Sequence, residues 1–166
     1  MTNFKIPLFE QFDSSINFDV LMKQVPLDLA DYILTMKNVP QDPEWHKEGS
    51  VYNHIKIVVN KAAKYNDIDL TIAALLHDTA KDRTTYIDDE GKVRSPGHAE
   101  RSLEVVDMYE TWIKNVGGNF GIIRNIVKYH MIFKIPGQIG RKLKSFIESS
   151  DFYDKLIKFT ECDKMT

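Results

Sequence analysis

Residues 69–81 read DLTIAALLHDTAK, and this stretch decides the fold of the chain. Its Ile72–Leu76 segment is apolar on every side, which is typical of a helix packed against several others. His77 and Asp78 follow directly, and an ionised aspartate at the end of a buried helix is costly unless a cation lies beside it. Lys81, one helical turn later, is a suitable partner for Asp78 but leaves His77 unexplained. A divalent cation would satisfy both side chains.

Helical periodicity continues on both sides of this stretch, and strand patterns are scarce. Besides the helix over 69–80, we expect helices over these ranges: 26–39, 51–62 with Ser50 as N-cap, 98–116, 120–131, 141–148 and 152–163. Breaks are expected at Gly117–Asn119 and at Pro136-Gly137. The turn signal Asp89-Glu90-Gly91 predicts an irregular loop over 81–97, long enough to act as a lid. The fold class predicted is all-α, a helical bundle of six to eight helices with a long loop after the His-Asp pair.

Composition limits the class of protein. The 166 residues are 43% hydrophobic and 28% charged, which suits one globular domain. With 22 Lys and Arg against 24 Asp and Glu, we expect no strong binding of duplex nucleic acid. The single cysteine, Cys162, excludes an internal disulfide and a zinc site with two thiolates. No leader and no apolar run of ~20 residues is found, so we expect a cytoplasmic protein without a membrane partner.

Six chemically suitable side chains fall near the ends of different predicted helices: His54, His77, Asp78, His98, His130 and Asp163. A single helical histidine is more often structural, and a His-Asp dipeptide also occurs by chance, so the set is the signal. Residues from separate helices that converge in a bundle core are how imidazole and carboxylate metal sites are made. Such ligands suit divalent Fe, Mn, Co, Ni, Zn or Mg.

The order His54, His77-Asp78 and Asp163 resembles the HD-domain superfamily of metal-dependent phosphohydrolases. Over roughly residues 38–166 it is similar to the HD domain of bacterial tRNA nucleotidyltransferases. The similar words are VPQDPEWHKE at 39–48 followed by His54, LHDTAK at 76–81 with Ala80 in place of the usual glycine, Gly97-His98, Tyr129-His130 and ECD at 161–163. The Gly-Ser and Asp-x-Asp signature of the nucleotidyltransferase domain is absent from these residues. We therefore expect one HD domain over 1–166, with 1–37 as a helical extension and 38–166 as the HD core.

The resemblance implies a set of ligands for one divalent metal: His54, His77, Asp78 and Asp163. In members with two metals the aspartate of the pair bridges them, and His98 and His130 stand where the ligands of the second ion would be. One or two ions are therefore expected, of Mn, Co, Ni, Fe, Mg or Zn. Asp78 and Lys81 are the expected catalytic residues, with Lys81 neutralising substrate phosphate. The alternative for Lys81 is an ordinary ion pair with Asp78 or Asp82.

Five residues are expected to bind substrate: Lys81, Arg101, His46, Glu48 and Tyr86. Arg101 follows His98 by about one helical turn, and its alternative is a solvated surface charge. His46 and Glu48 belong to the word that precedes the first expected ligand, although Glu48 equally suits a cap for the helix after Ser50. Tyr86, in the expected loop, is the best candidate for stacking on a base.

The function implied by the resemblance is hydrolysis of a nucleotide or of a phosphate at the 3′ end of an RNA, of the phosphomonoesterase or 2′,3′-cyclic phosphodiesterase type. Three alternatives stay open: a (deoxy)nucleotidase or dNTP hydrolase, a di-iron oxygenase of the HD type, and a non-catalytic nucleotide-binding module. Lys81 after the His-Asp pair favours phosphate over the oxygenase. The sequence does not predict the oligomeric state.

Overall fold

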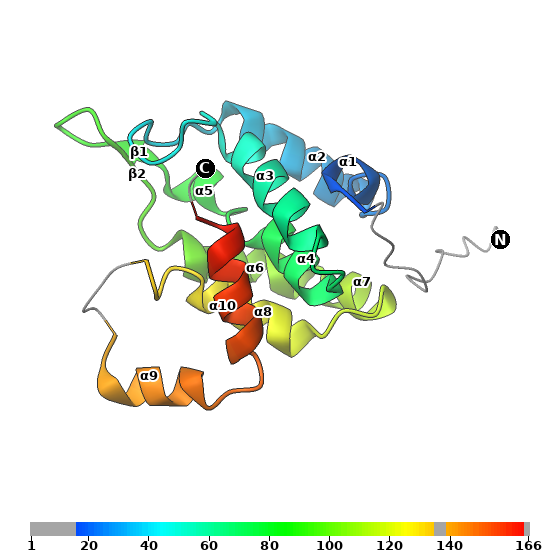
Figure 1. The fold of residues 1–166 in the computed structure, drawn as a ribbon. Coiled ribbons are helices and arrows are strands. Elements are labelled where there is room, and N and C mark those ends of the chain that lie inside the picture. Colours follow the sequence, from blue (N-terminus) through cyan, green and yellow to red (C-terminus); the bar gives the residue numbers. More distant parts are fainter. Residues whose placement is uncertain (1–15, 135–138, 165–166) are drawn as a thin grey trace.

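Helices dominate the computed structural model, which describes residues 16–134 and 139–164 (Figure 1). The elements are α1 (Phe18–Leu21), α2 (Leu27–Thr35), the 3-10 helix η1 (Met36–Asn38), α3 (Val51–Ala63), α4 (Ile68–Leu76), α5 (Lys81–Thr84), β1 (Tyr86–Ile87), β2 (Val93–Arg94), α6 (His98–Met108), α7 (Glu110–Asn115), α8 (Phe120–Tyr129), α9 (Arg141–Glu148) and α10 (Tyr153–Cys162). The all-α fold class is confirmed. In this described part, seven helices have eight or more residues, and the short α1, α5 and α7 come in addition. None of them combines the length and apolar composition that a membrane span requires.

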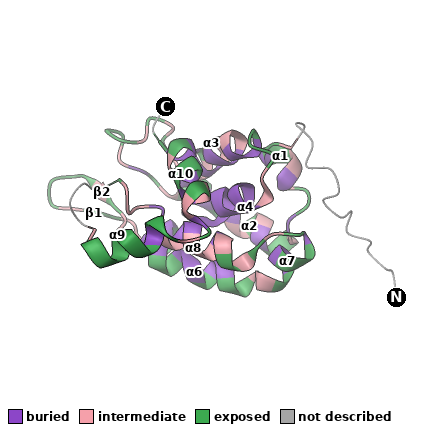
Figure 2. Ribbon diagram, turned by 60° about the horizontal axis from the view of Figure 1, so that its bottom comes forward, coloured by how far each residue is buried: buried purple, intermediate pink, exposed green. Residues whose placement is uncertain are grey.

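Helix α4 lies at the centre of the bundle, packed against α3, α6, α8 and α10. Asp67 caps its first turn by accepting hydrogen bonds from the backbone N–H groups of Asp69 and Leu70. Every residue from Asp69 to Leu76 is buried, and Figure 2 shows the helix enclosed by its neighbours. The apolar segment predicted to be packed on several sides is therefore the core helix, and it carries His77 and Asp78 at its C-terminal end.

The segment before α3 folds back on itself and is fastened at both ends. Pro40 and Ser50 form an isolated antiparallel bridge, and Gly49 takes the left-handed conformation, with φ 86°, that lets the chain turn there. Ser50 accepts a hydrogen bond from the backbone N–H of Asn53 and is the N-cap of α3, as predicted. The loop 40–50 is thereby held against the start of the helix that carries His54.

The N-terminal helices belong to the same hydrophobic core as the rest of the bundle. Phe18, Leu21, Leu29 and Ile33 are at most 1% exposed and lie in one cluster with residues of α3 and α4. Helices α2 and η1 occupy the range expected between Pro26 and Pro40. Residues 1–15 lie outside the described residues, and the division into an extension and an HD core stays a prediction.

Two expectations about local structure are wrong. The segment 81–97 is not an irregular loop, because it contains α5 and an antiparallel hairpin in which Tyr86 pairs with Arg94 and Ile87 with Val93. The predicted turn signal is the hairpin turn, and strands of two residues are too short to show alternation in the sequence. The helix expected over 98–116 is interrupted at Tyr109, with φ −102° and ψ 19°, and divides into α6 and α7. The break expected at Pro136-Gly137 lies outside the described residues.

Helix α10 is tied to the beginning of α4 by a cluster of charges. Lys155 Nζ lies 2.6 Å from Asp69 Oδ2 and 2.9 Å from Asp67 Oδ2. The other oxygen of Asp69 accepts a hydrogen bond of 2.7 Å from the backbone N–H of Asn119, the N-cap of α8. These contacts fix α10 and α8 relative to α4, and both helices end at the opposite end of α4, beside Asp78.

Candidate metal centre

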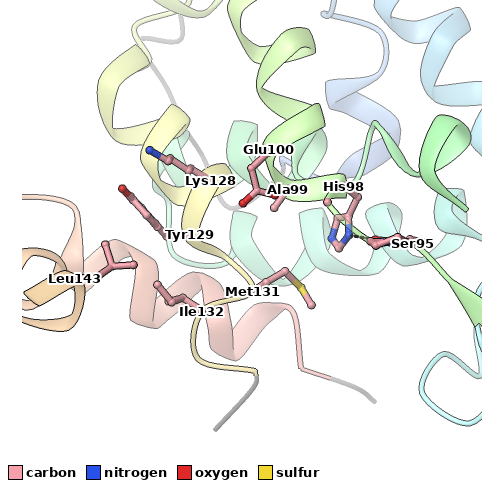
Figure 3. A pocket seen from close by; sticks show the side chains of 11 residues that line it. Ser95, His98, Ala99, Glu100, Lys128, Tyr129, Met131, Ile132 and Leu143 are labelled. Atoms are coloured by element: carbon pink, nitrogen blue, oxygen red, sulfur yellow. Dashed lines mark hydrogen bonds between the residues drawn. The ribbon is translucent and has the colours of Figure 1, made fainter. Parts of the chain in front are cut away.

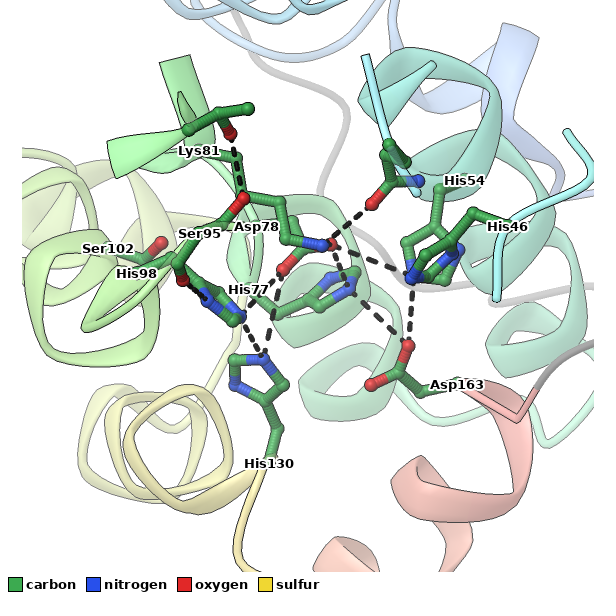
Figure 4. Close-up of polar contacts among 12 residues, drawn as sticks. His46, His54, His77, Asp78, Lys81, Ser95, His98, Ser102, His130 and Asp163 are labelled. Atoms are coloured by element: carbon green, nitrogen blue, oxygen red, sulfur yellow. Dashed lines mark hydrogen bonds and ion pairs between the residues drawn. The ribbon is translucent and has the colours of Figure 1, made fainter. Parts of the chain in front are cut away.

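Six buried side chains from five parts of the chain meet at the C-terminal end of α4 (Figure 4). They are the six residues that the sequence predicts as metal ligands: His54 on α3, His77 and Asp78 directly after α4, His98 at the start of α6, His130 directly after α8 and Asp163 directly after α10. Each is at most 6% exposed. The structure brings the whole set together, and we call it the centre.

Asp78 lies between two groups of imidazole nitrogens. Its Oδ2 is 3.3 Å from His77 Nε2 and 3.7 Å from His54 Nε2. Its Oδ1 is 3.2 Å from His98 Nε2 and 3.8 Å from His130 Nε2. One carboxylate oxygen thus faces each group, so Asp78 is the residue that could serve a metal on either side.

The centre divides into two half-sites. The first half-site consists of His54, His77 and Asp163, and the second of Asp78, His98 and His130. In each, one donor atom from every residue lies within 4.8 Å of the others. In the second, His98 Nε2 and His130 Nε2 are 3.1 Å apart. Two such nitrogens approach this closely only with a proton or a cation between them, because both otherwise present lone pairs.

The four histidines of the centre all turn Nδ1 away from it, toward an oxygen. The acceptors are Ala74 O at 2.9 Å from His77, Ser95 O at 2.7 Å from His98, Val127 O at 2.6 Å from His130 and Glu48 Oε1 at 2.7 Å from His54. Because carbonyl and carboxylate oxygens only accept hydrogen bonds, these contacts assign a proton to each Nδ1. Once unprotonated, the Nε2 atoms that face the centre can bind a metal, as in metal sites whose histidines are oriented by outer hydrogen bonds.

Three helices end at the centre. His77, His130 and Asp163 are the C-caps of α4, α8 and α10. The C-terminal end of a helix carries partial negative charge on its unpaired carbonyl groups. Three such ends around two buried carboxylates favour a cation in the space between them.

The buried nitrogen and oxygen atoms of the centre are suitable ligands for a divalent cation. Four of the buried atoms that have no hydrogen-bond partner within the described residues lie here: His77 Nε2, both oxygens of Asp78, and Asp163 Oδ2. Lys81 Nζ at 2.8 Å from Asp78 Oδ2 and Lys134 Nζ at 2.6 Å from Asp163 Oδ2 form ion pairs, but without the angles of a hydrogen bond. Buried polar atoms are nearly always partnered, and mixed imidazole and carboxylate donors suit divalent transition metals.

The protonation states agree with a cation site. Burial alone would raise the pKa of Asp78, but positive charge at His77 and Lys81 outweighs burial and holds that pKa well below 3.8. Burial lowers the pKa of His130 well below 6.5, with charge at His77 and His98 acting in the same direction. The centre therefore contains an ionised carboxylate beside a neutral imidazole, the states in which these groups bind metals.

Lys81 is held between the centre and the loop 40–50. It is 8% exposed, and its Nζ donates to Gln41 Oε1 at 2.7 Å and pairs with Asp78 at 2.8 Å. The ion pair with Asp78 that the sequence suggested is present, and it leaves the ammonium group at the edge of the centre. This position suits both expected roles of Lys81, which are binding of a substrate phosphate and an ion pair with Asp78.

A cavity of about 780 Å³ opens onto the centre. His98 and Asp163 of the centre form part of its wall, together with Lys81. The remaining lining residues are Trp45, His46, Arg94, Met131, Phe133, Lys134, Thr160 and Lys164. Four cationic side chains and an indole that is 55% exposed thus surround the approach to the centre.

A second cavity, of about 440 Å³, shares His98 and Met131 with the first (Figure 3). Tyr129, Ile132 and Leu143 form an apolar part of its wall. Of the six residues of the centre, it touches His98 alone. The first cavity, lined by both His98 and Asp163, therefore has more of the centre in its wall than the second.

Two of the expected substrate-binding residues lie away from the centre. Arg101 has a side chain 65% exposed and pairs with Glu104 at 3.2 Å, as its solvated alternative predicts. Tyr86, on β1, is 53% exposed and lines none of the three cavities that His98 lines. Trp45 and Phe133 are the aromatic side chains that line the larger cavity.

His46 and Glu48 lie on the outer side of His54. Glu48 Oε1 accepts hydrogen bonds from His54 Nδ1 and from His46 Nδ1, the latter at 2.9 Å. Burial opposes ionisation of Glu48, but these hydrogen bonds outweigh it and lower the pKa from 4.5 to about 2. Glu48 therefore does not cap α3 with its side chain, as one alternative had it, since the cap is Ser50.

The sequence interpretation missed Gln41 as the second partner of Lys81 and missed part of the wall of the cavity. Gln41, Trp45 and Arg94 were not among the residues expected to bind substrate. Gln41 and Trp45 belong to the distinctive word at 39–48, which was the available signal. No sequence signal pointed to Arg94, because its position beside the cavity depends on the hairpin.

Comparison with known proteins gives one match. The family model described as HD domain matches residues 51–157, more than half of the chain. No curated protein and no solved structure shows significant similarity to the chain.

Proposed function

Because the chain belongs to the HD domain family, a superfamily of metal-dependent phosphohydrolases, we propose that it hydrolyses a phosphate ester of a nucleotide or of an RNA 3′ end. Phosphomonoesterase and 2′,3′-cyclic phosphodiesterase are the proposed activities. The observation that carries this proposal is the position of Asp78 between the two half-sites, with Lys81 Nζ 2.8 Å from it.

We assign the first half-site to one divalent ion and the second half-site to another, with Asp78 shared. When bound, such an ion makes water acidic enough to supply a nucleophile near neutral pH and withdraws charge from a phosphate. The donors support this assignment because each histidine presents Nε2 and is fixed through Nδ1.

Lys81 is proposed to bind a phosphoryl oxygen of the substrate. Its hydrogen bond to Gln41 holds the ammonium group at the rim of the centre, so it needs no reorganisation when charge develops on the phosphate. Lys134 is the second cation within reach, because it pairs with Asp163 and lines the cavity. Both lysines neutralise acidic groups that would otherwise repel the substrate.

The body of the substrate is proposed to lie in the larger cavity. Trp45 offers an exposed ring for stacking on a base, and Arg94 adds a charge on the hairpin side. A cavity of about 780 Å³ suits a mononucleotide or the terminal nucleotide of an RNA. The likeness of residues 39–54 to the HD domain of tRNA nucleotidyltransferases supports an RNA end as substrate.

The test is release of phosphate or opening of a cyclic phosphate by the full chain, with Mn²⁺, Co²⁺, Ni²⁺ or Mg²⁺ supplied. The substrates are 2′,3′-cyclic nucleotides, 3′- and 5′-nucleoside monophosphates, and dNTPs. We expect turnover of the 2′,3′-cyclic nucleotides and of the 3′-nucleoside monophosphates. Turnover of 5′-monophosphates or dNTPs alone would identify the nucleotidase alternative instead.

Two other functions have distinct outcomes in the same experiment. Binding of a nucleotide without turnover, under every metal, would identify a nucleotide-binding module. Oxygen consumption by iron-loaded protein, without phosphate release, would identify the oxygenase. Lys81 and Lys134, the two lysines beside the centre, favour a phosphate substrate over the oxygenase alternative.

A further inference from the structure

Glu48 joins two imidazoles that face different parts of the site. The same oxygen, Oε1, is 2.7 Å from His54 Nδ1 and 2.9 Å from His46 Nδ1. His54 is buried and turns Nε2 into the centre, whereas His46 lines the larger cavity. Figure 4 shows the two rings side by side, and their centroids are 4.8 Å apart at an interplanar angle of 85°.

His54 differs from the other three histidines of the centre in what holds it. Those three donate Nδ1–H to the carbonyl oxygen of the residue three positions earlier, so the backbone alone orients them. They lie at helix ends, where such carbonyl groups are accessible. His54 lies inside α3, where carbonyl groups are engaged by the helix, and its acceptor is a side chain from the loop 40–50.

We propose that Glu48 is a positioning residue of the metal centre, which fixes His54 with Nδ1–H turned outward and Nε2 turned toward Asp163 and Asp78. The inference rests on the metal centre of the proposed function and on no particular substrate. A carboxylate behind an imidazole ligand fixes its tautomer and makes the ligand nitrogen more basic. His46 completes the arrangement by donating a second hydrogen bond to the same oxygen of Glu48.

This role separates the effects of neighbouring substitutions. Loss of Glu48 frees the His54 ring to rotate and to place its proton on either nitrogen, so metal affinity falls. Loss of His46 leaves the contact between Glu48 and His54 in place, so metal affinity is kept and the wall of the cavity changes. Glu48→Gln keeps an oxygen that accepts a hydrogen bond from His54 but loses the negative charge. Its metal affinity is therefore expected to lie between those of the wild type and Glu48→Ala.

The experiment measures Mn²⁺ binding to the full chain by isothermal titration calorimetry. We expect Glu48→Ala to raise the Kd by about 10- to 100-fold, Glu48→Gln to raise it less, and His46→Ala to leave it within about 2-fold while raising KM. The matched control is Glu44→Gln, an exposed carboxylate of the same loop, which should bind like the wild type. Metal-free thermal melting of every variant reports whether it folds.

A second measurement reads the imidazole itself. In Zn²⁺-loaded protein, long-range ¹H–¹⁵N spectra should show His54 protonated at Nδ1 in the wild type and in Glu48→Gln, and a lost or mixed pattern in Glu48→Ala. A purely structural role for Glu48 would lower the melting temperature without changing this pattern.

The outcomes separate this inference from the proposed function. A wild type that binds no divalent metal contradicts the proposed function itself. A wild type that binds Mn²⁺, with Glu48→Ala equal to it in affinity and in the His54 pattern, overturns the role of Glu48 alone. If Glu48→Ala does not fold, an unchanged Kd in the folded Glu48→Gln variant overturns it.

Discussion

His54 and Asp163 are 109 residues apart in the chain, and His54 Nε2 lies 2.9 Å from Asp163 Oδ1. Because His54 Nδ1 also faces Glu48, both ring nitrogens donate to carboxylates in this arrangement. Burial alone would lower the pKa of His54, but the hydrogen bonds to Asp163 and Glu48 outweigh it and raise that pKa above 6.5. Without a metal, His54 therefore keeps a proton on Nε2 to a higher pH than an ordinary imidazole does.

Metal binding is expected to release this proton. Because Nε2 is protonated below the raised pKa, Mn²⁺ affinity should increase as the pH rises through that pKa and then level off. Calorimetric titrations at pH 7 in buffers of different ionisation enthalpy should give different apparent binding enthalpies. An enthalpy that is independent of the buffer would contradict protonated His54.

In the metal-free protein the same proton contributes stability. A group whose pKa is raised by folding stabilises the folded state fully below its unfolded pKa, here about 6.5. That contribution is lost as the pH rises through the higher folded pKa. We expect the melting temperature of the metal-free wild type to fall over this range more than that of His54→Gln, measured by circular dichroism.

Asp78→Ala is expected to abolish bound metal and turnover together, because Asp78 faces both half-sites. The variant also leaves Lys81 buried without its ion-pair partner, at a cost of about 3–5 kcal/mol. Asp78→Asn keeps the volume of the side chain and serves as the more stable version. Metal content by elemental analysis and phosphate release are the measurements.

The matched control for Asp78 is Asp89→Ala, an exposed carboxylate in the turn between β1 and β2. It should keep metal content and turnover at the level of the wild type. Turnover by Asp78→Ala with metal still bound would show that the ligand assignment is incorrect.

Lys81→Met is expected to separate catalysis from metal binding. Loss of a preorganised cation beside the developing charge should lower kcat by about 100- to 1000-fold, while Mn²⁺ still binds. In the metal-free protein Asp78 loses its nearest cation, so thermal stability should fall and be largely restored by Mn²⁺.

Lys92→Met, on the exposed turn of the hairpin, is the control for Lys81→Met and should change neither property. Equal kcat in the two variants would mean that Lys81 forms only an ordinary ion pair with Asp78 and has no part in catalysis. Lys81→Arg should not restore kcat fully, because a guanidinium presents its N–H groups in a rigid planar fork, whereas one ammonium nitrogen contacts both Gln41 and Asp78 here.

The two half-sites should lose their ions separately. We expect two Mn²⁺ per wild-type chain by native mass spectrometry. His130→Asn should retain one ion, at the first half-site, and His54→Asn should weaken that half-site instead. A wild type with one ion that both variants lose equally would mean that the donors form one site.

The six residues of the centre were predictable because each stands at a position that the sequence marks. His77 and Asp78 follow an apolar run that only a buried helix explains. His98, His130 and Asp163 lie at the ends of periodic segments, and His54 lies within the periodic segment that begins at Val51. The resemblance then supplied their order along the chain. Their convergence in space agrees with the rule that ligands from separate helices meet inside a bundle.

What escaped prediction depends on contacts between distant segments. The hairpin has strands of two residues, so no period could show in the sequence. Arg101 is on the helix face suggested by its spacing from His98, but its long side chain reaches Glu104 and solvent instead. The bond between Glu48 and His54 joins a loop to a helix across a turn at Gly49, and no local pattern encodes its geometry.

His77, His130 and Asp163 each stand immediately behind a helix, and this makes helix length a functional property. One residue inserted into α8 would swing His130 by about 100° about the helix axis and shift it by about 1.5 Å. Its Nε2 would then leave the second half-site. Insertions and deletions compatible with this centre are therefore confined to connections such as the turn between β1 and β2, where they do not rotate any ligand about a helix axis.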